Sequence, residues 1–226
     1  MFTYKEKEYS FHTFVVGDTN GKAYEAVKNF VDFLDSNPML FLYGNAGCGK
    51  THLAKAAARE FERQNFSVKV INSDMFVSEL IWCLQHKNTD EDGAEVFCRQ
   101  YESVDVLILD DIHFMVAKET TQQCFGRILE HFIKQRKKIL VTSNKKLGEY
   151  KWLCDYLKND VICSVQYGIE APDMELKKKI LKNLEEEWEF ELSDESVELI
   201  VEQTRDIRQV EGMFKKMMAY HQLMGV

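Results

Sequence analysis

The sequence predicts an α/β fold, in which a parallel five-stranded sheet lies between helices and a small all-α unit follows. Up to about residue 170, short runs rich in Val, Ile, Leu and Phe alternate with longer runs of helical spacing. That alternation is typical of parallel strands joined by crossover helices. Beyond Ala171-Pro172-Asp173 only helical patterns remain. We therefore expect a core over residues 1–170 and a helical lid over residues 171–226.

The expected elements follow one another between polar or glycine-containing breaks. Strands are expected at residues 39–43, 67–71, 104–110, 138–143 and 161–169. Core helices are expected at residues 53–61, 74–85, a short stretch ending at 101, 120–134 and 147–157. Lid helices are expected at residues 174–187, 194–203 and 207–223. The only two prolines, Pro38 and Pro172, stand at boundaries of this scheme, and Ser193 has the character of a helix N-cap.

Composition narrows the class of protein. The chain has 226 residues, of which 45% are hydrophobic, and its formal net charge is −8. An acidic chain is poorly suited to coating duplex DNA, because neutralising phosphates needs a basic face. No apolar run is long enough for a membrane span and no signal-peptide pattern opens the chain, so we expect a cytoplasmic protein. The six cysteines match no zinc or disulfide framework, and Cys48 alone lies in a position where oxidation or alkylation would matter.

The sequence Gly44-Asn45-Ala46-Gly47-Cys48-Gly49-Lys50-Thr51 is a complete phosphate-binding P-loop. It follows an apolar strand and precedes an Ala-rich helix, which is the context that separates a P-loop from a chance match. The glycines let the N–H groups of Asn45 to Thr51 turn toward phosphate oxygens, and the helix N-terminus adds its positive dipole end. We expect Lys50 to reach the β- and γ-phosphates and Thr51 to offer its hydroxyl to Mg²⁺.

Two carboxylates end the apolar run from Val106 to Asp111. We expect this strand to lie beside the strand that precedes the P-loop. Asp110 is then a candidate for holding Mg²⁺ through water, and Asp111 for orienting or deprotonating an attacking water. The next strand ends in Asn144, whose amide is expected between the P-loop and Asp111, where it could sense the γ-phosphate or fix the water.

Together these residues resemble the AAA+ ATPases, and specifically the ATPase domain of the bacterial replication initiator DnaA. The residues that carry the resemblance are 11–17 with Asn20 and 23–24, 104–114 with 118–122, and 206–212. The resemblance implies that Val15 and Val16 line an adenine pocket. It also implies that Arg208, at the start of the last helix, is a sensor 2 residue that contacts the nucleotide from the lid.

The sequence departs from the DnaA pattern in two respects. Asp160 stands where the resemblance places an arginine finger, and such a finger contributes about 10³–10⁵ in rate. We therefore expect slow intrinsic hydrolysis. The sequence shows no match to the DNA-binding and helicase-interaction domains of DnaA. In this respect it resembles the lone-domain relatives Hda, DnaC and DnaI. The first ten residues, however, carry no clamp-binding peptide of the Hda type.

Contact with single-stranded DNA is left open by the sequence. Lys118 and Thr121 match the segment that grips a single strand in DnaA, but Thr120 replaces an arginine, and the acidic residues 90–92 lie near the other expected contact region. A solvated helix start is an equally good interpretation.

The leading hypothesis is an ATP- or ADP-binding, Mg²⁺-dependent DnaA-like protein. It would act in replication initiation, its regulation or helicase loading, by docking to another AAA+ protein or the replicative helicase. The alternative is an active ATPase that is completed by an arginine from a partner subunit and binds single-stranded DNA. A small-molecule kinase is disfavoured by Asp110-Asp111, Asn144 and the lid with Arg208.

Overall fold

A computed structural model gives the fold and describes residues 8–33, 37–86, 92–115, 119–151 and 164–224. Its strands are β1 (Met39–Gly44), β2 (Val68–Asn72), β3 (Val106–Asp110), β4 (Lys138–Ser143) and β5 (Ser164–Ile169). Around them lie α1 (Gly21–Asp32), α2 (Lys50–Arg63), α3 (Ser73–Gln85), α4 (Gly93–Glu102) and α5 (Glu119–Lys134). Short 3₁₀ turns are η1 (Ile112–Met115) and η2 (Leu147–Glu149). The chain continues with α7 (Met174–Trp188), α8 (Asp194–Gln203) and α9 (Ile207–Met224).

The five strands form one parallel sheet in the order β2-β3-β4-β1-β5. The parallel α/β architecture predicted from the sequence is confirmed. The prediction that β3 lies beside β1 is wrong, because β4 is inserted between them and pairs with both, Met39 with Ile139 and Val106 with Lys138. The carboxyl ends of β3, β4 and β1 still meet at one edge of the sheet, with β4 in the middle.

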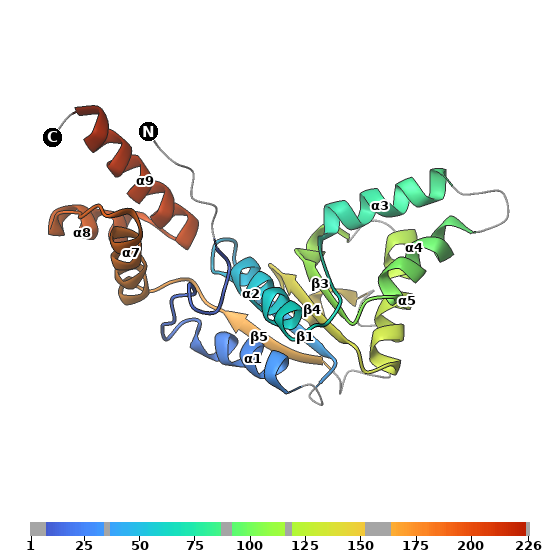
Figure 1. The fold of residues 1–226 in the computed structure, drawn as a ribbon. Coiled ribbons are helices and arrows are strands. Elements are labelled where there is room, and N and C mark those ends of the chain that lie inside the picture. The colour runs from blue at the N-terminus through green and yellow to red at the C-terminus, as the bar shows by residue number, and fades with distance from the viewer. Residues whose placement is uncertain (1–7, 34–36, 87–91, 116–118, 152–163, 225–226) are drawn as a thin grey trace.

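Helices cover both faces of the sheet, as Figure 1 shows. Successive strand residues point to opposite faces. Phe41 of β1 therefore packs in the cluster built by α3, α4 and α5, whereas its neighbours Leu40 and Leu42 pack in the cluster built by α1 and α2. The near-continuous apolar runs of β1 and β3 and the apolar centre of β4 follow from this burial on both faces.

Two sequence predictions for helices need adjustment. The helix α1 was not expected, although Ala23, Val27, Phe30 and Val31 are spaced along one face and buried. The helix expected at residues 147–157 begins as the 3₁₀ turn η2, and residues 152–163 lie outside the described part of the chain.

The last three helices, α7 to α9, pack on one another. Leu176, Ile200, Val210 and Phe214 are almost completely buried in their shared apolar cluster. Side chains cap the first two of these helices, α7 and α8: Asp173 accepts from the Leu176 amide at 2.7 Å, and Ser193 accepts from the Ser196 amide at 3.3 Å. In Figure 1 these helices extend from the β5 side of the sheet, away from α3 and α4.

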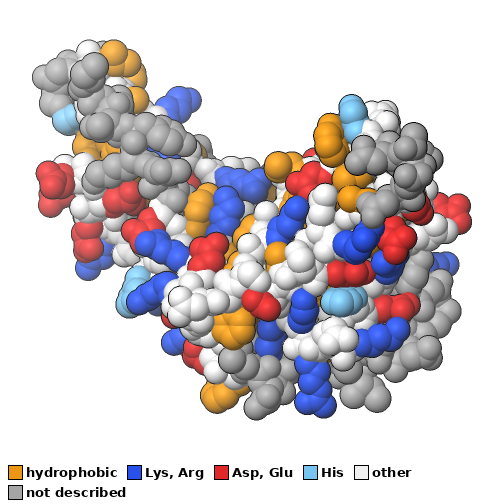
Figure 2. Space-filling model, turned by 45° about the vertical axis from the view of Figure 1, so that its right-hand side comes forward, with side chains coloured by type: hydrophobic (Ala, Val, Ile, Leu, Met, Phe, Trp, Pro, Cys, Tyr) orange, Lys and Arg blue, Asp and Glu red, His pale blue; other side chains and the backbone are white. Residues whose placement is uncertain are grey.

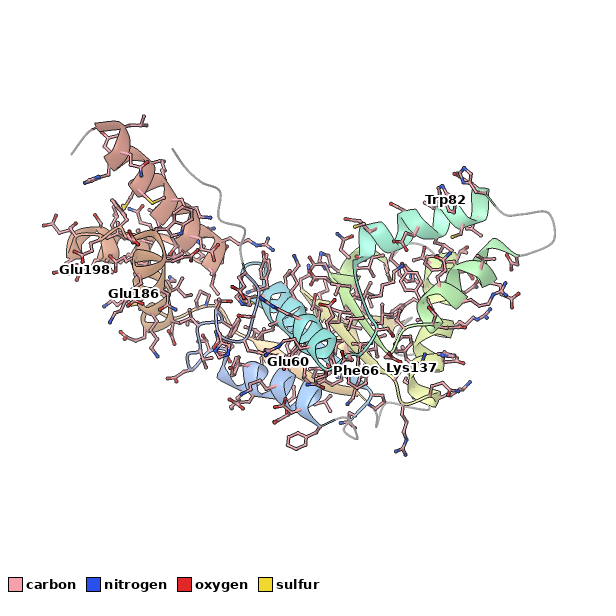
Figure 3. All side chains as sticks on the ribbon, viewed as in Figure 1. Glu60, Phe66, Trp82, Lys137, Glu186 and Glu198 are labelled. Atoms are coloured by element: carbon pink, nitrogen blue, oxygen red, sulfur yellow. The ribbon has the colours of Figure 1, made fainter. Side chains whose placement is uncertain are left out.

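On the opposite side, α3 and α4 project from the sheet as an arm (Figure 1). A polar contact ties this arm to the edge strand β2. Glu79 of α3 accepts from Lys69 Nζ of β2 at 2.9 Å and from the Tyr101 hydroxyl of α4 at 2.6 Å. Figure 3 shows Trp82 near the outer end of α3, where its side chain points away from the sheet.

None of the helices in the described ranges combines the length and the apolar character that a membrane span requires. In the space-filling view, acidic and basic side chains are interspersed over the visible face (Figure 2). This visible face therefore carries charges of both signs side by side.

Candidate nucleotide and metal site

The glycine-rich loop joins β1 to α2 at the carboxyl edge of the sheet. Gly47 and Gly49 have φ values of +73° and +106°, a left-handed region that side chains other than glycine rarely adopt. Gly49 immediately precedes α2, so the loop leads directly into the helix N-terminus. Asn45 and Ala46 are exposed at the tip of the loop. This geometry fits a phosphate group, since it turns backbone N–H groups and a helix dipole toward one point.

The ammonium group of Lys50 lies inside the loop. Its side chain is only 6% exposed, and Nζ donates to the carbonyl oxygens of Gly44 and Asn45, each at 2.9 Å. Nζ also donates to the Cys48 sulfur at 3.9 Å, so the positive charge is held at the loop by two carbonyl oxygens and a thiol. A phosphate oxygen carries a formal charge and would be a stronger acceptor than either carbonyl.

Three side chains from α2, β3 and β4 converge beside the loop. The Thr51 hydroxyl donates to Asp110 Oδ2 at 2.8 Å, and the Thr142 hydroxyl donates to the other oxygen, Asp110 Oδ1. A hydroxyl and a carboxylate in direct contact next to a phosphate loop are oxygen ligands of the kind that Mg²⁺ prefers. Thr51 and Asp110 thus fit the pair that would hold Mg²⁺ between the loop and the sheet.

The second carboxylate belongs to Asp111, whose backbone has a positive φ and whose side-chain pKa is raised. Its φ is +59°, and its N–H donates to Thr142 Oγ1 at 2.9 Å. Burial, followed by the neighbouring Asp110 carboxylate, raises the pKa of Asp111 above its ordinary value. The charges of His113, Lys50 and Arg208 partly oppose this effect, and His113 Nδ1 lies 3.8 Å from Asp111 Oδ1. A raised pKa suits a carboxylate that accepts a proton from water.

The raised pKa of Asp111 leads to a stability prediction. A carboxyl group whose pKa is higher in the folded state loses its stabilising contribution as pH rises through that pKa. We expect Asp111→Asn to raise the Tm near about pH 7, and the gain to shrink as the pH falls toward the ordinary carboxyl pKa of about 4, because the wild-type group takes up its proton on the way. Asparagine also tolerates a positive φ. Thermal unfolding at both pH values measures the effect, and an equal or lower Tm near neutrality would contradict the assigned burial of this charge.

The other predicted site residues lie around this centre. Asn144 is exposed and directly follows β4, between the ends of β3 and β1. Arg208 is exposed in the first turn of α9. Val15 is half-buried against the cluster of α7 to α9, and Val16 is 40% exposed. The buried Asn20 fixes this segment, because its Nδ2 donates to Val15 O at 3.0 Å and its Oδ1 accepts from the Gly17 amide at 2.8 Å.

Cys48 is 2% exposed, and burial raises the pKa of its thiol even though Lys50 lowers it in part. Because the thiolate is the reactive form, this environment disfavours the oxidation or alkylation considered from the sequence.

The contacts of two residues near the loop, Thr142 and His52, were not predicted from the sequence. The Thr142 hydroxyl donates to the Asp110 carboxylate and accepts from the Asp111 backbone N–H, and its only sequence signal is a polar residue at the end of an apolar strand. His52, next to Thr51, lies edge-on to Phe14 at 5.2 Å, and its Nε2 lies 3.0 Å from Ser10 O. This contact fastens residues 10–14, which lead to Val15 and Val16, onto α2.

Two positions discussed from the sequence lie outside the described residues: Asp160, which stands where the resemblance places an arginine finger, and Lys118, for which contact with single-stranded DNA was left open. The matching Thr121 is described and is only 3% exposed, so its side chain is not available for direct contact with a strand. The sequence pattern suggested such a contact, but Thr121 faces inward in the amphipathic helix α5, among its buried residues.

The sheet order β2-β3-β4-β1-β5, the loop after β1 and the acidic end of β3 define a P-loop protein of the AAA+ class. Comparison with known proteins is more specific. The family model described as the bacterial DnaA ATPase domain matches residues 5–169. The chain therefore belongs to the bacterial DnaA ATPase-domain family.

Relatives and solved structures agree with this assignment. The chain is 32% identical over 210 residues to the chromosomal replication initiator protein DnaA of Aquifex aeolicus, which covers 92% of the chain and 51% of that protein. It is similar to domain III of DnaA from Thermotoga maritima, with a TM-score of 0.85 and 25% identity over 99% of the chain and 92% of that domain. A replication initiator DnaA bound to AMPPCP and single-stranded DNA has a TM-score of 0.82 at 29% identity, covering 94% of the chain and 65% of that protein. The chain thus spans about half the length of the curated relative.

Proposed function

We propose that the protein binds ATP and ADP with Mg²⁺ at the Gly44–Thr51 loop. The observation that carries the proposal is the convergence of Lys50, Thr51 and Asp110, with a 2.8 Å contact between Thr51 and Asp110 beside the loop. In this arrangement Lys50 and the loop amides from Asn45 to Thr51 bind phosphates, while Thr51 and Asp110 hold the metal. Val15 and Val16 line the adenine side, and Arg208 reaches the nucleotide from α9. A related DnaA was solved with the ATP analogue AMPPCP, which supports the ligand class.

The proposed role is a nucleotide-dependent switch in replication initiation, its regulation or helicase loading. Residues 1–170 act as the nucleotide-binding core and residues 171–226 as the lid, which is supported by the separate apolar cluster of α7 to α9. Asp111 and Asn144 act on the attacking water. Intrinsic hydrolysis is slow, because Asp160 replaces the expected arginine finger. Nucleotide state then changes docking to another AAA+ protein or to the replicative helicase.

The test is an equilibrium titration with ATP and ADP, together with phosphate release and a pull-down of DnaA and replicative helicase with and without ATP. The proposal expects saturable binding of both nucleotides, little phosphate release and nucleotide-dependent capture. Nucleotide binding without nucleotide-dependent capture would contradict the switch and leave the nucleotide site standing.

Arg208 provides a separate prediction about the lid. Its charge acts on Asp111 from the first turn of α9, which supports the proposal that Arg208 reaches the γ-phosphate. We expect Arg208→Ala to lower the affinity for ATP by about tenfold, because one charge-assisted hydrogen bond is lost. The affinity for ADP should fall by much less. Arg205→Ala, three residues earlier and also exposed, is the matched control. Equal loss of ATP and ADP affinity in Arg208→Ala would contradict a role of Arg208 in sensing the γ-phosphate.

A second candidate function is an ATPase that binds single-stranded DNA and is completed by a partner's arginine. The specific observation is the exposed aromatic surface of the arm, where Trp82 is 59% exposed and stacks on His86 at 4.8 Å. Flat aromatic faces stack on unpaired bases. Trp82→Ala should lower affinity for an oligonucleotide in the presence of ATP, whereas unchanged affinity would reject this surface as the DNA contact.

A further inference from the structure

The start of α9 lies directly on the phosphate loop. The Ile207 amide donates to the Gly47 carbonyl at 3.0 Å, which joins the last helix to the centre of the loop. First-turn amides have no partner inside their own helix, so this amide finds its acceptor in the loop. The Ile207 side chain also approaches the next loop glycine, since a β-carbon on Gly49 would lie 4.0 Å from Ile207 Cδ1.

Asp206 packs against the same glycine and caps the same helix. A β-carbon added to Gly47 would lie 2.7 Å from both Asp206 Cγ and Oδ1, so the carboxylate rests against the bare α-carbon. The same Oδ1 accepts from the Gln209 amide at 2.9 Å, as an N-cap does. In return, Gln209 Oε1 accepts from the Arg205 amide at 2.9 Å. The carboxylate is thus fixed by the helix on one side and by the loop on the other.

We propose that Asp206 is a positioning residue that latches α9 to Gly47 and so holds Arg208 at the phosphate loop. This inference rests on the proposed nucleotide site and goes beyond it, because Asp206 needs no contact with the nucleotide. The latch transmits loop geometry to the lid: a phosphate that moves the Gly47 peptide also moves the acceptor of the Ile207 amide. A glycine at position 47 therefore meets two requirements: it adopts a positive φ, and it leaves room for Asp206 to pack against its α-carbon.

The latch predicts selective effects on the two nucleotides. Asp206→Ala removes the cap and the packing, so ATP affinity should fall by about fivefold, and the ratio of ATP to ADP affinity should fall with it. Asp206→Asn retains a capping oxygen and should stay within about twofold of the wild type. The matched control is Asp173→Ala, which removes the equivalent cap from α7 and should leave the ratio unchanged. The latch is refuted if Asp206→Ala keeps the wild-type ratio, or if Asp173→Ala shifts it equally.

A second measurement needs no nucleotide. Amide hydrogen exchange, read residue by residue in the nucleotide-free protein, should find Ile207 protected, because its amide is bonded to Gly47 O. Asp206→Ala should remove this protection, and Asp173→Ala should not. Rapid exchange at Ile207 in the wild type would overturn the latch directly. Absence of nucleotide binding in the wild type would instead reject the proposed function, and the exchange result would still decide whether the latch exists.

Discussion

Lys50→Ala should abolish useful nucleotide binding, lowering ATP affinity on the order of 100-fold, because about two charge-assisted hydrogen bonds to phosphate are lost. Lys50 is the buried cation of the loop, and its Nζ already lies 2.9 Å from two loop carbonyls. Under the proposed function, ATP binding would transfer this donor from carbonyl oxygens to phosphate oxygens. Isothermal titration at fixed Mg²⁺ measures the loss.

The control for this prediction is Lys55→Ala, on the same helix. Lys55 is exposed, and its Nζ lies 4.4 Å from the centre of the Tyr9 ring, away from the loop. The Lys55→Ala protein should bind ATP with the affinity of the wild type. Thermal unfolding of Lys50→Ala separates loss of the ligand contact from loss of the fold. A folded Lys50→Ala protein with wild-type ATP affinity would show that the loop does not hold phosphate.

Asp110→Asn should remove the Mg²⁺ dependence of ATP binding. The Asp110 carboxylate accepts from Thr51 at 2.8 Å and from Thr142, and the isosteric amide retains the shape while losing the charge and one acceptor. We expect ATP affinity with Mg²⁺ to fall by about tenfold or more, because a metal site loses an anionic ligand, while affinity in EDTA changes little.

Asp105→Asn is the control at the opposite end of the same strand. Asp105 also accepts two hydrogen bonds, from the amide and the hydroxyl of Ser67. These bonds lower the pKa of Asp105, so its substitution tests the loss of a well-bonded carboxylate that lies far from the loop. It should preserve the full Mg²⁺ effect. An Asp110→Asn protein that still binds ATP more tightly with Mg²⁺ would exclude this carboxylate as the metal ligand.

Much of the fold could be predicted from the sequence because the strands are buried on both faces. Strand β4 was predicted with its observed bounds, 138–143, around the apolar centre Ile139-Leu140-Val141. The P-loop could be predicted because its function requires particular residues at fixed spacing. By contrast, α1 carries polar residues between its buried positions and follows a turn-like Asp18-Thr19-Asn20, so its helical spacing was less evident.

Contacts between distant segments could not be predicted in the same way. The order of strands depends on which crossover each helix makes, and no residue of β1 indicates that β4 rather than β3 lies beside it. The Asp206–Gly47 contact joins residues far apart in the chain, and each has a sufficient local explanation, one as a cap and the other as a turn glycine. The two hydrogen bonds of the Thr142 hydroxyl, one donated to the Asp110 carboxylate and one accepted from the Asp111 amide, likewise depend on the register of β3 against β4.

The measurement that tests the central claim most directly is titration of the wild-type protein with ATP and with ADP, each with Mg²⁺ and with EDTA. The account predicts one saturable site for both nucleotides, with ATP bound more tightly when Mg²⁺ is present, because Thr51 and Asp110 lie together beside the loop. Absence of saturable binding, or ATP affinity that does not respond to Mg²⁺, would contradict it.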